Sequence, residues 1–210
     1  MAQKEHIVKQ AAQMFASYGI KAVRMDDIAH ELGVSKRTLY ELFGDKEELL
    51  FEAIMELFNR KRTEHTTIAA KAENVLEAMF MVLNEIMLEA PLHDRLTANL
   101  RRFYPKVFER VKSEGIEENN RSLRLLIEKG VEQEFFVGWM NLDLTISLFC
   151  AAARSLRGKD EQILVPEGMT EREAFMQLLT TLFRGIATTK GRELIDKYSG
   201  QYLTESRTNR

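Results

Sequence analysis

A short stretch of the chain concentrates side chains that suit contact with nucleic acid. Its candidate contact residues are Ser35, Lys36, Arg37, Thr38, Tyr40 and Lys46. An arginine can donate two hydrogen bonds to the edge of a guanine, whereas a lysine ammonium usually neutralises a phosphate. Arg37 is therefore the best candidate for reading a base, and Lys36, Tyr40 and Lys46 are candidates for holding phosphates. The competing interpretation is ordinary solvated charge, and Glu41 on the same face counts against a cationic patch.

Other reactive side chains lack a spacing that supports catalysis or metal binding. The four histidines are scattered along the chain: His6, His30, His65 and His93. The lone Cys150 lies in an alanine-rich stretch and is most simply a small buried apolar residue. Asp26 and Asp27 fall in the first turn of a predicted helix, where carboxylates favour the helix dipole. The sequence therefore predicts no catalytic residue, no metal site and no cofactor.

The predicted contact residues need a rigid element to present them, and two short helices fit that need. From Met25 to Leu32, apolar residues recur at helical spacing, so this helix has one face to bury. Gly33 can end it, and Ser35 can cap a second helix whose buried side carries Leu39 and Phe43. Two helices joined by a short turn, the second offering cations and an aromatic ring, form the layout of a DNA-binding helix-turn-helix.

Flanking helices are expected to support this pair. A helix from Ile7 to Tyr18, closed by Gly19, completes a three-helix domain over residues 1–46. A bundle of about 45 residues is marginal alone, so it should pack against the next helices of the chain. Asp45 and Glu48 have the spacing of a capping box, which predicts a fourth helix running to the charged residues 60–62. That helix is the expected link to the second domain, residues 47–210.

The periodicity of the remaining chain is helical, which predicts an all-α fold. Pro91 should stop one helix, and Pro105 should end or bend the next. Three further helical patterns cover residues 106–132, 141–158 and 170–191. Residues 135–140 are expected to form an apolar loop or helix end. The remainder after Gly191, ending in SRTNR, is expected to fray.

Composition excludes several classes of protein. The chain has 210 residues, of which 45% are hydrophobic and 30% charged, and its formal net charge is -2. This balance argues against a generally basic nucleic-acid coat protein, so affinity for phosphate must come from a local patch. One cysteine cannot form an intramolecular disulfide. Without an apparent leader or a membrane-spanning run, a cytoplasmic location is the simplest expectation, with no membrane partner.

Two sets of apolar residues have either a binding or a packing interpretation. Methionines and aromatics suit an adaptable ligand surface, and the candidates are Met55, Phe80, Met87, Phe103, Tyr104, Trp139 and Phe149. A broad seam suits a contact between protomers, and it comprises Phe175, Leu178, Leu179, Leu182, Phe183 and Ile186. At helical spacing both sets are more often ordinary core. The length and width of the seam favour a dimer.

Several short motifs keep one register between Phe15 and Leu50. They are Tyr18-Gly19, Asp27-Ile28-Ala29, Leu32-Gly33-Val34-Ser35, Thr38-Leu39-Tyr40, Phe43 and Lys46-Glu47-Glu48-Leu49. Together they resemble the DNA-binding domain of the TetR family of bacterial transcriptional repressors. The resemblance covers the first quarter of the chain, and the rest is similar in length and helical rhythm alone.

The resemblance implies a homodimer whose recognition helices enter successive major grooves of a partly palindromic operator. It also implies a C-terminal domain that binds an inducer and dimerises through its last two long helices. Lys36 and Arg37 would lie near base edges, and Thr38, Tyr40 and Lys46 near phosphates. Val23 and Arg24 stand where the family usually has capping threonines, so the cap must come from elsewhere and Arg24 can reach a phosphate. Arg37 replaces a frequent glycine, which bears on the operator sequence.

The resulting hypothesis is a ligand-responsive repressor released from its operator by a small apolar or amphipathic molecule. The first alternative is an architectural or cell-division DNA-binding protein on the same scaffold, whose second half binds a protein partner. The second is an all-α enzyme in which the turn motif is accidental. A double variant, Tyr40→Ala with Lys46→Ala, distinguishes the repressor from the enzyme. The repressor hypothesis predicts that it loses operator binding, whereas the enzyme hypothesis predicts that it keeps full function.

Overall fold

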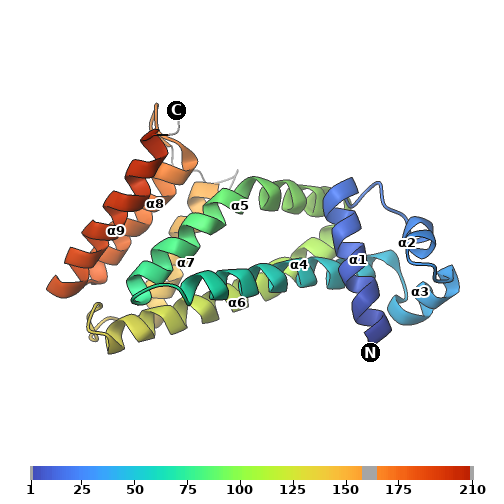
Figure 1. Cartoon of the computed structure of the whole chain (residues 1–210), viewed down its shortest axis with the longest axis horizontal. Helices are drawn as coiled ribbons and strands as arrows, with labels where there is room; N and C mark the ends of the chain where they lie inside the picture. The colour runs from blue at the N-terminus through green and yellow to red at the C-terminus, as the bar shows by residue number, and fades with distance from the viewer. Residues whose placement is uncertain (1, 158–164, 209–210) are drawn as a thin grey trace. The chain divides into compact units, whose positions relative to one another are not determined.

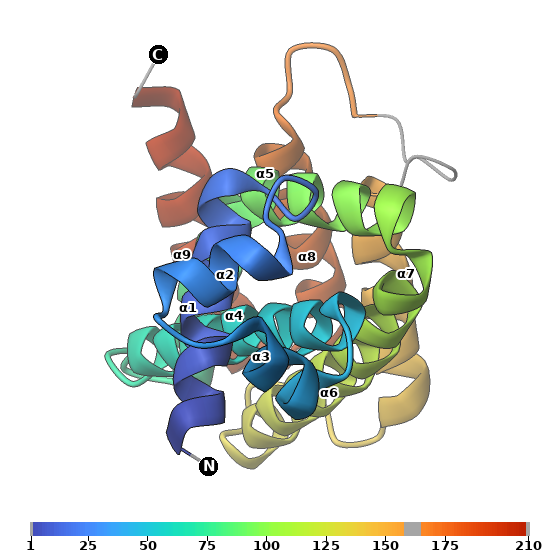
Figure 2. The ribbon, with the colours of Figure 1, turned by 90° about the vertical axis from the view of Figure 1, so that its right-hand side faces the viewer.

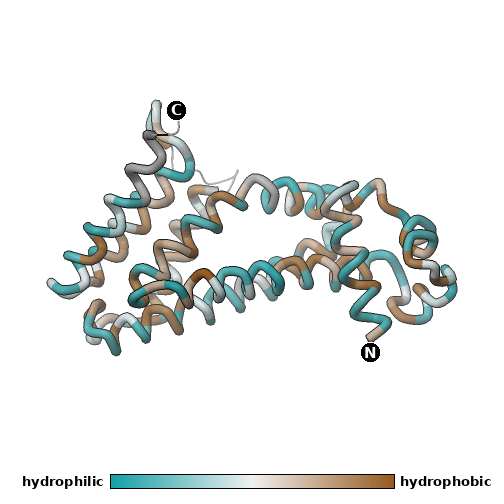
Figure 3. The backbone as a smooth tube through the Cα atoms, viewed as in Figure 1, coloured by the Kyte–Doolittle hydropathy of each residue, from teal (hydrophilic) through white to brown (hydrophobic). Residues whose placement is uncertain are grey.

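The structure is a computed structural model that describes residues 2–157 and 165–208. Within those ranges the chain is helical apart from turns and one isolated bridge, which confirms the all-α prediction. Hydrophobic and hydrophilic residues alternate along the helices, as amphipathic packing requires (Figure 3). Among the described helices, none is long and apolar enough to cross a membrane.

The chain forms two compact units. The first comprises Met1–Glu64 and Glu89–Ile116, and the second comprises His65–Leu88 and Glu117–Arg210. The first unit contains α1 (Ala2–Tyr18), α2 (Met25–Glu31) and α3 (Lys36–Phe43), and parts of α4 (Lys46–Ala69), α5 (Val75–Phe103) and α6 (Pro105–Glu132). The boundary predicted at residue 46 therefore lies inside a compact unit rather than between two units.

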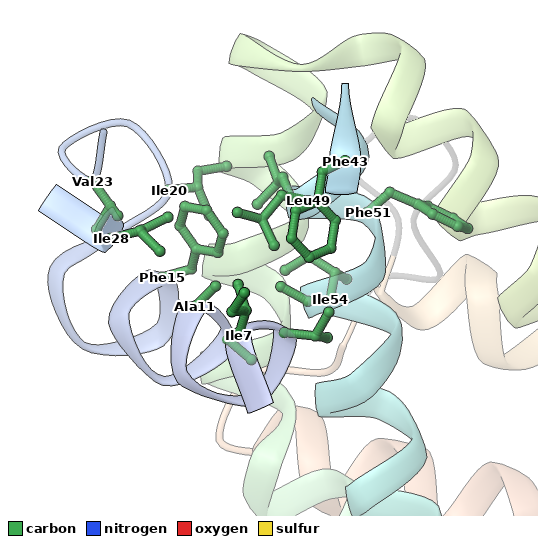
Figure 4. Packing of buried hydrophobic residues seen from close by; sticks show 14 of the residues in the cluster. Ile7, Ala11, Phe15, Ile20, Val23, Ile28, Phe43, Leu49, Phe51 and Ile54 are labelled. Carbon is green, nitrogen blue, oxygen red and sulfur yellow. The ribbon is translucent and has the colours of Figure 1, made fainter. Parts of the chain in front are cut away.

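The core of the first unit explains why the first three helices do not stand alone. Figure 4 shows Ile7, Phe15, Ile28, Phe43, Leu49 and Ile54 pointing into one cluster. Leu100, Val107 and Val111, from α5 and α6, are buried in the same cluster. Burial of this apolar surface stabilises the small domain, which confirms the prediction that it packs against the helices that follow it in the chain.

The start of α4 is fixed by a cap and by an ion pair to α6. Asp45 Oδ1 accepts a hydrogen bond from the backbone N–H of Glu48 at 2.8 Å, which confirms half of the predicted capping box. The Glu48 carboxylate turns instead to α6, where Arg110 Nη1 donates to Glu48 Oε2 at 2.6 Å. The Arg110 guanidinium also lies 3.8 Å from the centre of the Phe51 ring. The helix continues to Ala69, beyond its predicted end.

Pro91 does not stop a helix, so that prediction is wrong. The helix α5 runs without interruption from Val75 to Phe103. A proline inside a helix removes one backbone hydrogen bond and costs about 3 kcal/mol. Met87 and Ala90, just before it, are both buried, and burial along the helix offsets this cost. Pro105 does end the preceding helix, because α6 begins at that residue, where a missing N–H is harmless.

The second unit contains α7 (Leu142–Arg157), α8 (Glu171–Ile186) and α9 (Thr189–Thr208) with the remaining parts of α4, α5 and α6. Asn141 Oδ1 caps α7 by accepting from Leu144 N at 2.9 Å, and Gly158, its predicted end, lies outside the described residues. Thr170 and Glu173 form the predicted capping box of α8. Figure 1 shows α8 and α9 side by side, and among the described residues these two helices form the most extensive helix pair.

The helix α9 contradicts the expectation that the chain frays after Gly191. Gly191 is buried inside α9, and a Cβ at this position would clash with the carbonyl oxygen of Phe135. Ile195 and Tyr198 are also fully buried, so positions 191, 195 and 198 form one packed face. Gly191 is therefore a site of close approach between backbones rather than a helix end.

Candidate DNA-binding surface

The turn between α2 and α3 is built from local hydrogen bonds. Gly33 adopts a left-handed conformation with φ of 63°, which ends α2 as predicted. Ser35 Oγ then accepts from Thr38 N at 3.0 Å and caps α3. The Ser35 and Thr38 hydroxyl oxygens lie 2.8 Å apart and share a hydrogen bond. These contacts give Ser35 and Thr38 positioning roles, and their contact with DNA stays a prediction.

The start of α2 confirms that its cap comes from outside the expected threonine positions. Asp27 Oδ2 accepts a hydrogen bond from the backbone N–H of Arg24 at 2.7 Å. Arg24 itself is exposed, and it has no side-chain acceptor to satisfy a helix N–H. Arg24 is thus the exposed N-cap residue of α2, and its contact with a phosphate stays a prediction.

The helix α3 divides into a buried side and an exposed side. Leu39 and Phe43 are buried in the cluster of the first unit. On the opposite side, the Arg37 side chain is 87% exposed and Tyr40 is 43% exposed. Figure 2 shows α3 on the outer side of the first unit with α2 next to it. The predicted division of this helix is confirmed, and its exposed side is accessible to a duplex.

Both cations at the start of α3 are held by carboxylates. Lys36 Nζ lies 2.7 Å from Asp26 Oδ1, and this hydrogen bond raises the pKa of Lys36 above its ordinary value. Arg37 Nε donates to Glu41 Oε1 at 2.7 Å, one helical turn further along. The sequence points to these partners only weakly: Glu41 follows Arg37 at i+4, whereas Asp26 is brought to Lys36 by the turn.

Lys46 has a packing role that its sequence position did not reveal. Its ammonium donates to the carbonyl oxygen of Ile20 at 2.8 Å and lies 5.3 Å from the centre of the Tyr104 ring. The side chain is half-buried, and it ties the start of α4 to the segment between α1 and α2. A phosphate contact by Lys46 stays a prediction.

The residues expected to bind a ligand are divided between the two units. Met55, Phe103 and Tyr104 are half-buried in the first unit, where Phe103 lies under the Lys21 ammonium at 4.8 Å. In the second unit Phe80, Met87 and Phe149 are buried. Trp139 is 84% exposed and lies in the segment between α6 and α7, so it does not share the buried environment of the other candidates in the second unit. Its contact with a ligand stays a prediction.

The buried ligand candidates of the second unit belong to an aromatic cluster around Phe183. The ring centres of Phe149 and Phe80 lie 4.9 Å and 6.2 Å from that of Phe183. Phe136 lies 6.0 Å from Phe183, and Tyr198 lies 6.1 Å from Phe80. Tyr198 Oη also accepts from Asn74 Nδ2 at 2.8 Å. This cluster is the core of the second unit, so a ligand there must displace or part packed rings.

The seam expected to form a dimer separates into two rows on α8. Phe175, Leu179 and Phe183, at intervals of four residues, are buried within the single chain. The second row, Leu178, Leu182 and Ile186, is half-buried. The first row therefore packs inside the second unit, and the second row keeps apolar surface available for another chain.

Comparison with known proteins relates the N-terminal part of the chain to a family. Residues 7–53 match the model of the family described as bacterial regulatory proteins, tetR family. The chain is 33% identical over 85 residues to an uncharacterized HTH-type transcriptional regulator, YhgD, of Bacillus subtilis (strain 168). That match covers 39% of this chain and 44% of the relative, so the chain spans less than half of the relative's length.

Solved structures share the fold over most of the chain. A transcriptional regulator of the TetR family from Cytophaga hutchinsonii has a TM-score of 0.65 at 15% identity, covering 90% of this chain and 96% of its own. A putative transcriptional regulator from Saccharomonospora viridis, solved in complex with choline, has a TM-score of 0.58 at 20% identity, covering 89% and 98%. Residues 7–53 therefore match the tetR family of bacterial regulatory proteins, and the chain shares the helical fold of the regulators from Cytophaga hutchinsonii and Saccharomonospora viridis.

Proposed function

We propose that the chain is a dimeric, ligand-responsive repressor that reads a partly palindromic operator with α3. The observation that carries this proposal is the exposed face of α3, which is capped by Ser35 and anchored by buried Leu39 and Phe43. A helix of eight residues that is capped at its start and packed against the core on one side can enter a major groove without rearrangement of the domain. Arg37 reads a base in this proposal, and Lys36, Thr38 and Tyr40 hold the flanking phosphates.

Two other candidate phosphate contacts lie at helix starts beside α3. Arg24 precedes α2 and is exposed, which suits a direct contact. Lys46 begins α4 and is engaged with the Ile20 carbonyl, so its ammonium must share that bond or leave it to reach DNA. Tyr40→Ala is consequently a cleaner test of DNA contact than a variant that also removes Lys46, because loss of Lys46 removes an internal bond as well.

The proposed ligand is a small apolar or amphipathic molecule that binds among the apolar side chains of the second unit. Phe80, Met87 and Phe149 supply apolar and polarisable surface of the kind such ligands prefer. The structural relative from Saccharomonospora viridis contains choline, which shows that this fold accommodates a small molecule in that protein. The helix α4 follows α3 in the chain and ends in the second unit. It is therefore a continuous element that can transmit a change at the proposed ligand site to α3.

The proposed dimer contact uses the second row of α8, Leu178, Leu182 and Ile186, together with α9. These side chains keep exposed apolar surface in the single chain. Two-fold pairing of such a helix pair would bury it and set the spacing of two recognition helices. The architectural alternative is not favoured, because the proteins from Bacillus, Cytophaga and Saccharomonospora that resemble this chain are described as transcriptional regulators.

Selection of binding sites from random duplex DNA with the purified full chain tests the DNA-binding part of the proposal. We expect an enriched inverted repeat, because two identical recognition helices read two identical half-sites. Absence of any enriched sequence would overturn the proposal. Titration of the complex with candidate small molecules tests the response, and operator affinity that stays constant while a molecule saturates the protein would exclude that molecule as an inducer.

A further inference from the structure

We infer that Glu41 is a positioning residue for base recognition, which fixes the Arg37 guanidinium for reading guanine. This inference rests on the proposed function and adds to it a specificity determinant on the exposed face of α3. Glu41 looks unfavourable for DNA binding, because its carboxylate repels phosphates. Its hydrogen bond to Arg37 gives it the opposite effect at one base pair.

The geometry of the pair limits how Arg37 can approach a base. Glu41 Oε1 accepts from Nε of Arg37 at 2.7 Å, which occupies the inner donor of the guanidinium fork. The two terminal nitrogens, Nη1 and Nη2, then remain for the duplex. Guanine offers two acceptors, O6 and N7, side by side in the major groove, and the terminal pair of donors can match both. The bond to Glu41 thus selects an end-on approach that fits guanine.

The pair is exposed in the free protein, and its effect is expected mainly in the complex. The Arg37 side chain is 87% exposed and the Glu41 side chain is 59% exposed, so water screens their attraction. Inside a major groove water is partly excluded, and the same hydrogen bond becomes stronger. Arg37 also loses rotational freedom before binding, which lowers the entropy lost when it contacts a base.

The neighbouring cation is oriented differently, which leaves Arg37 as the base reader. Lys36 is directed back to Asp26 on α2, with 2.7 Å between Nζ and Oδ1. An ammonium held there is a point charge near the start of α3, and it lacks the planar fork that distinguishes guanine. Specificity at the start of α3 therefore depends on Arg37 and on the carboxylate that orients it.

The test compares affinity and base preference in the same variants of the full chain. The probes are the duplex selected by the wild type, the same duplex with the guanine pair changed to an adenine pair, and a random duplex. We expect Glu41→Ala to bind random DNA about threefold more tightly, because one phosphate-repelling charge is lost. We expect its preference for guanine over adenine to fall about tenfold, because Arg37 is no longer oriented.

Matched variants separate charge from positioning. Glu41→Gln loses the charge but keeps an oxygen that can accept from Nε, so it should bind all DNA more tightly and retain most of the guanine preference. Glu31→Ala removes an exposed carboxylate on α2, outside the Arg37 pair, and should leave the preference unchanged. In an Arg37→Lys background, Glu41→Ala should no longer change the preference, because the fork it orients is absent. Circular dichroism and thermal melting check that each variant is folded.

The outcomes separate this inference from the proposed function. A guanine preference that is equally strong in the wild type and in Glu41→Ala would overturn the role of Glu41 and leave the repressor proposal standing. A motif that does not depend on Arg37 would also overturn it. If the wild type enriches no sequence at all, the proposed function fails and the role of Glu41 fails with it.

Discussion

Individual side chains organise the exposed face of α3 before a duplex is present. The Ser35 hydroxyl caps the helix, Asp26 holds Lys36, and Glu41 holds Arg37. Each exposed ion pair contributes little to folding stability, because water screens the charges. Their main effect is on the orientation of the two cations, because they determine which donor atoms of Lys36 and Arg37 remain for a binding partner.

Removal of the Ser35 cap should weaken both the fold and DNA binding. Ser35→Ala leaves an N–H of the first turn of α3 without its acceptor, which typically costs about 1 kcal/mol. We expect urea unfolding to detect this loss and DNA binding to weaken as the start of α3 frays. Ser35→Asn keeps a capping oxygen and should retain nearly all of the stability. Equal stability of Ser35→Ala and the wild type would exclude the capping role.

Whole helices are joined within the first unit by a few specific contacts around α4. Lys4 Nζ on α1 lies 2.6 Å from Glu52 Oε1 on α4, and the Glu48 to Arg110 pair joins α4 to α6. Lys61 Nζ lies 2.6 Å from Glu89 Oε1 and joins α4 to α5. The helix proposed to carry a ligand signal is thus attached to three of its neighbours by paired charges.

The Glu48 to Arg110 pair should give a pH-dependent contribution to stability. The hydrogen bond from Arg110 lowers the pKa of Glu48 below its ordinary value, so the charged form is favoured in the folded chain. Its stabilisation is present above the ordinary glutamate pKa of about 4.3 and is lost as the pH falls below it. Glu48→Gln should therefore lower stability at neutral pH, by no more than about 1 kcal/mol because the pair is partly exposed.

Urea titrations at several pH values measure this difference. The wild type and Glu48→Gln should converge in stability as the pH falls through the lowered pKa of Glu48, where the wild-type carboxyl becomes protonated. Glu47→Gln removes a neighbouring carboxylate of the same helix turn, so it controls for the loss of the interaction with the helix dipole. A gap between wild type and Glu48→Gln that persists unchanged at low pH would contradict the assignment.

The contact between α9 and the segment before α7 should depend on the absence of a side chain at Gly191. Gly191→Ala places a methyl group against the Phe135 carbonyl oxygen, and overpacking of this kind costs about 1–3 kcal/mol. Gly200, in the same helix, has no neighbouring atom within contact range of a new Cβ among the described residues. Gly200→Ala should stabilise the chain by up to about 1 kcal/mol. Thermal melting that shifted in the same direction for both variants would exclude the close-approach role.

The molecule as a whole was partly predictable from its sequence. Local signals were reliable: Gly33, Ser35, Asn141 and Thr170 end or start helices as their chemistry predicts. They were reliable because caps and turns are satisfied by residues three or four positions away.

Signals that depend on distant packing were not predictable in the same way. Pro91 lies inside a helix because burial offsets its cost, and Gly191 marks a close contact with Phe135, 56 positions earlier in the chain (191 minus 135). Trp139 is exposed, although a large aromatic side chain is usually expected against other apolar residues. Lys46 donates to the carbonyl oxygen of Ile20, which lies 26 positions earlier in the chain. Each of these outcomes depends on which segments meet in space, which a single sequence states only weakly.

The state of assembly should depend on the half-buried row of α8. Leu178→Glu with Leu182→Glu places two charges on the proposed contact between protomers, where burial without a partner is unfavourable. We expect a dimeric wild type and a monomeric double variant by sedimentation. Leu144→Glu, at an exposed leucine of α7, serves as the control and should remain dimeric. A double variant that stays dimeric would place the contact elsewhere.

Binding of the full chain to matched duplexes tests the central claim most directly. One duplex carries the selected operator with both half-sites intact, and the other has one half-site scrambled, at equal length and salt concentration. If the protein binds as a dimer through the α3 helix of each protomer, we expect two protomers per intact operator and at least about a tenfold weaker affinity for the scrambled duplex. Equal affinity for the two duplexes would contradict it.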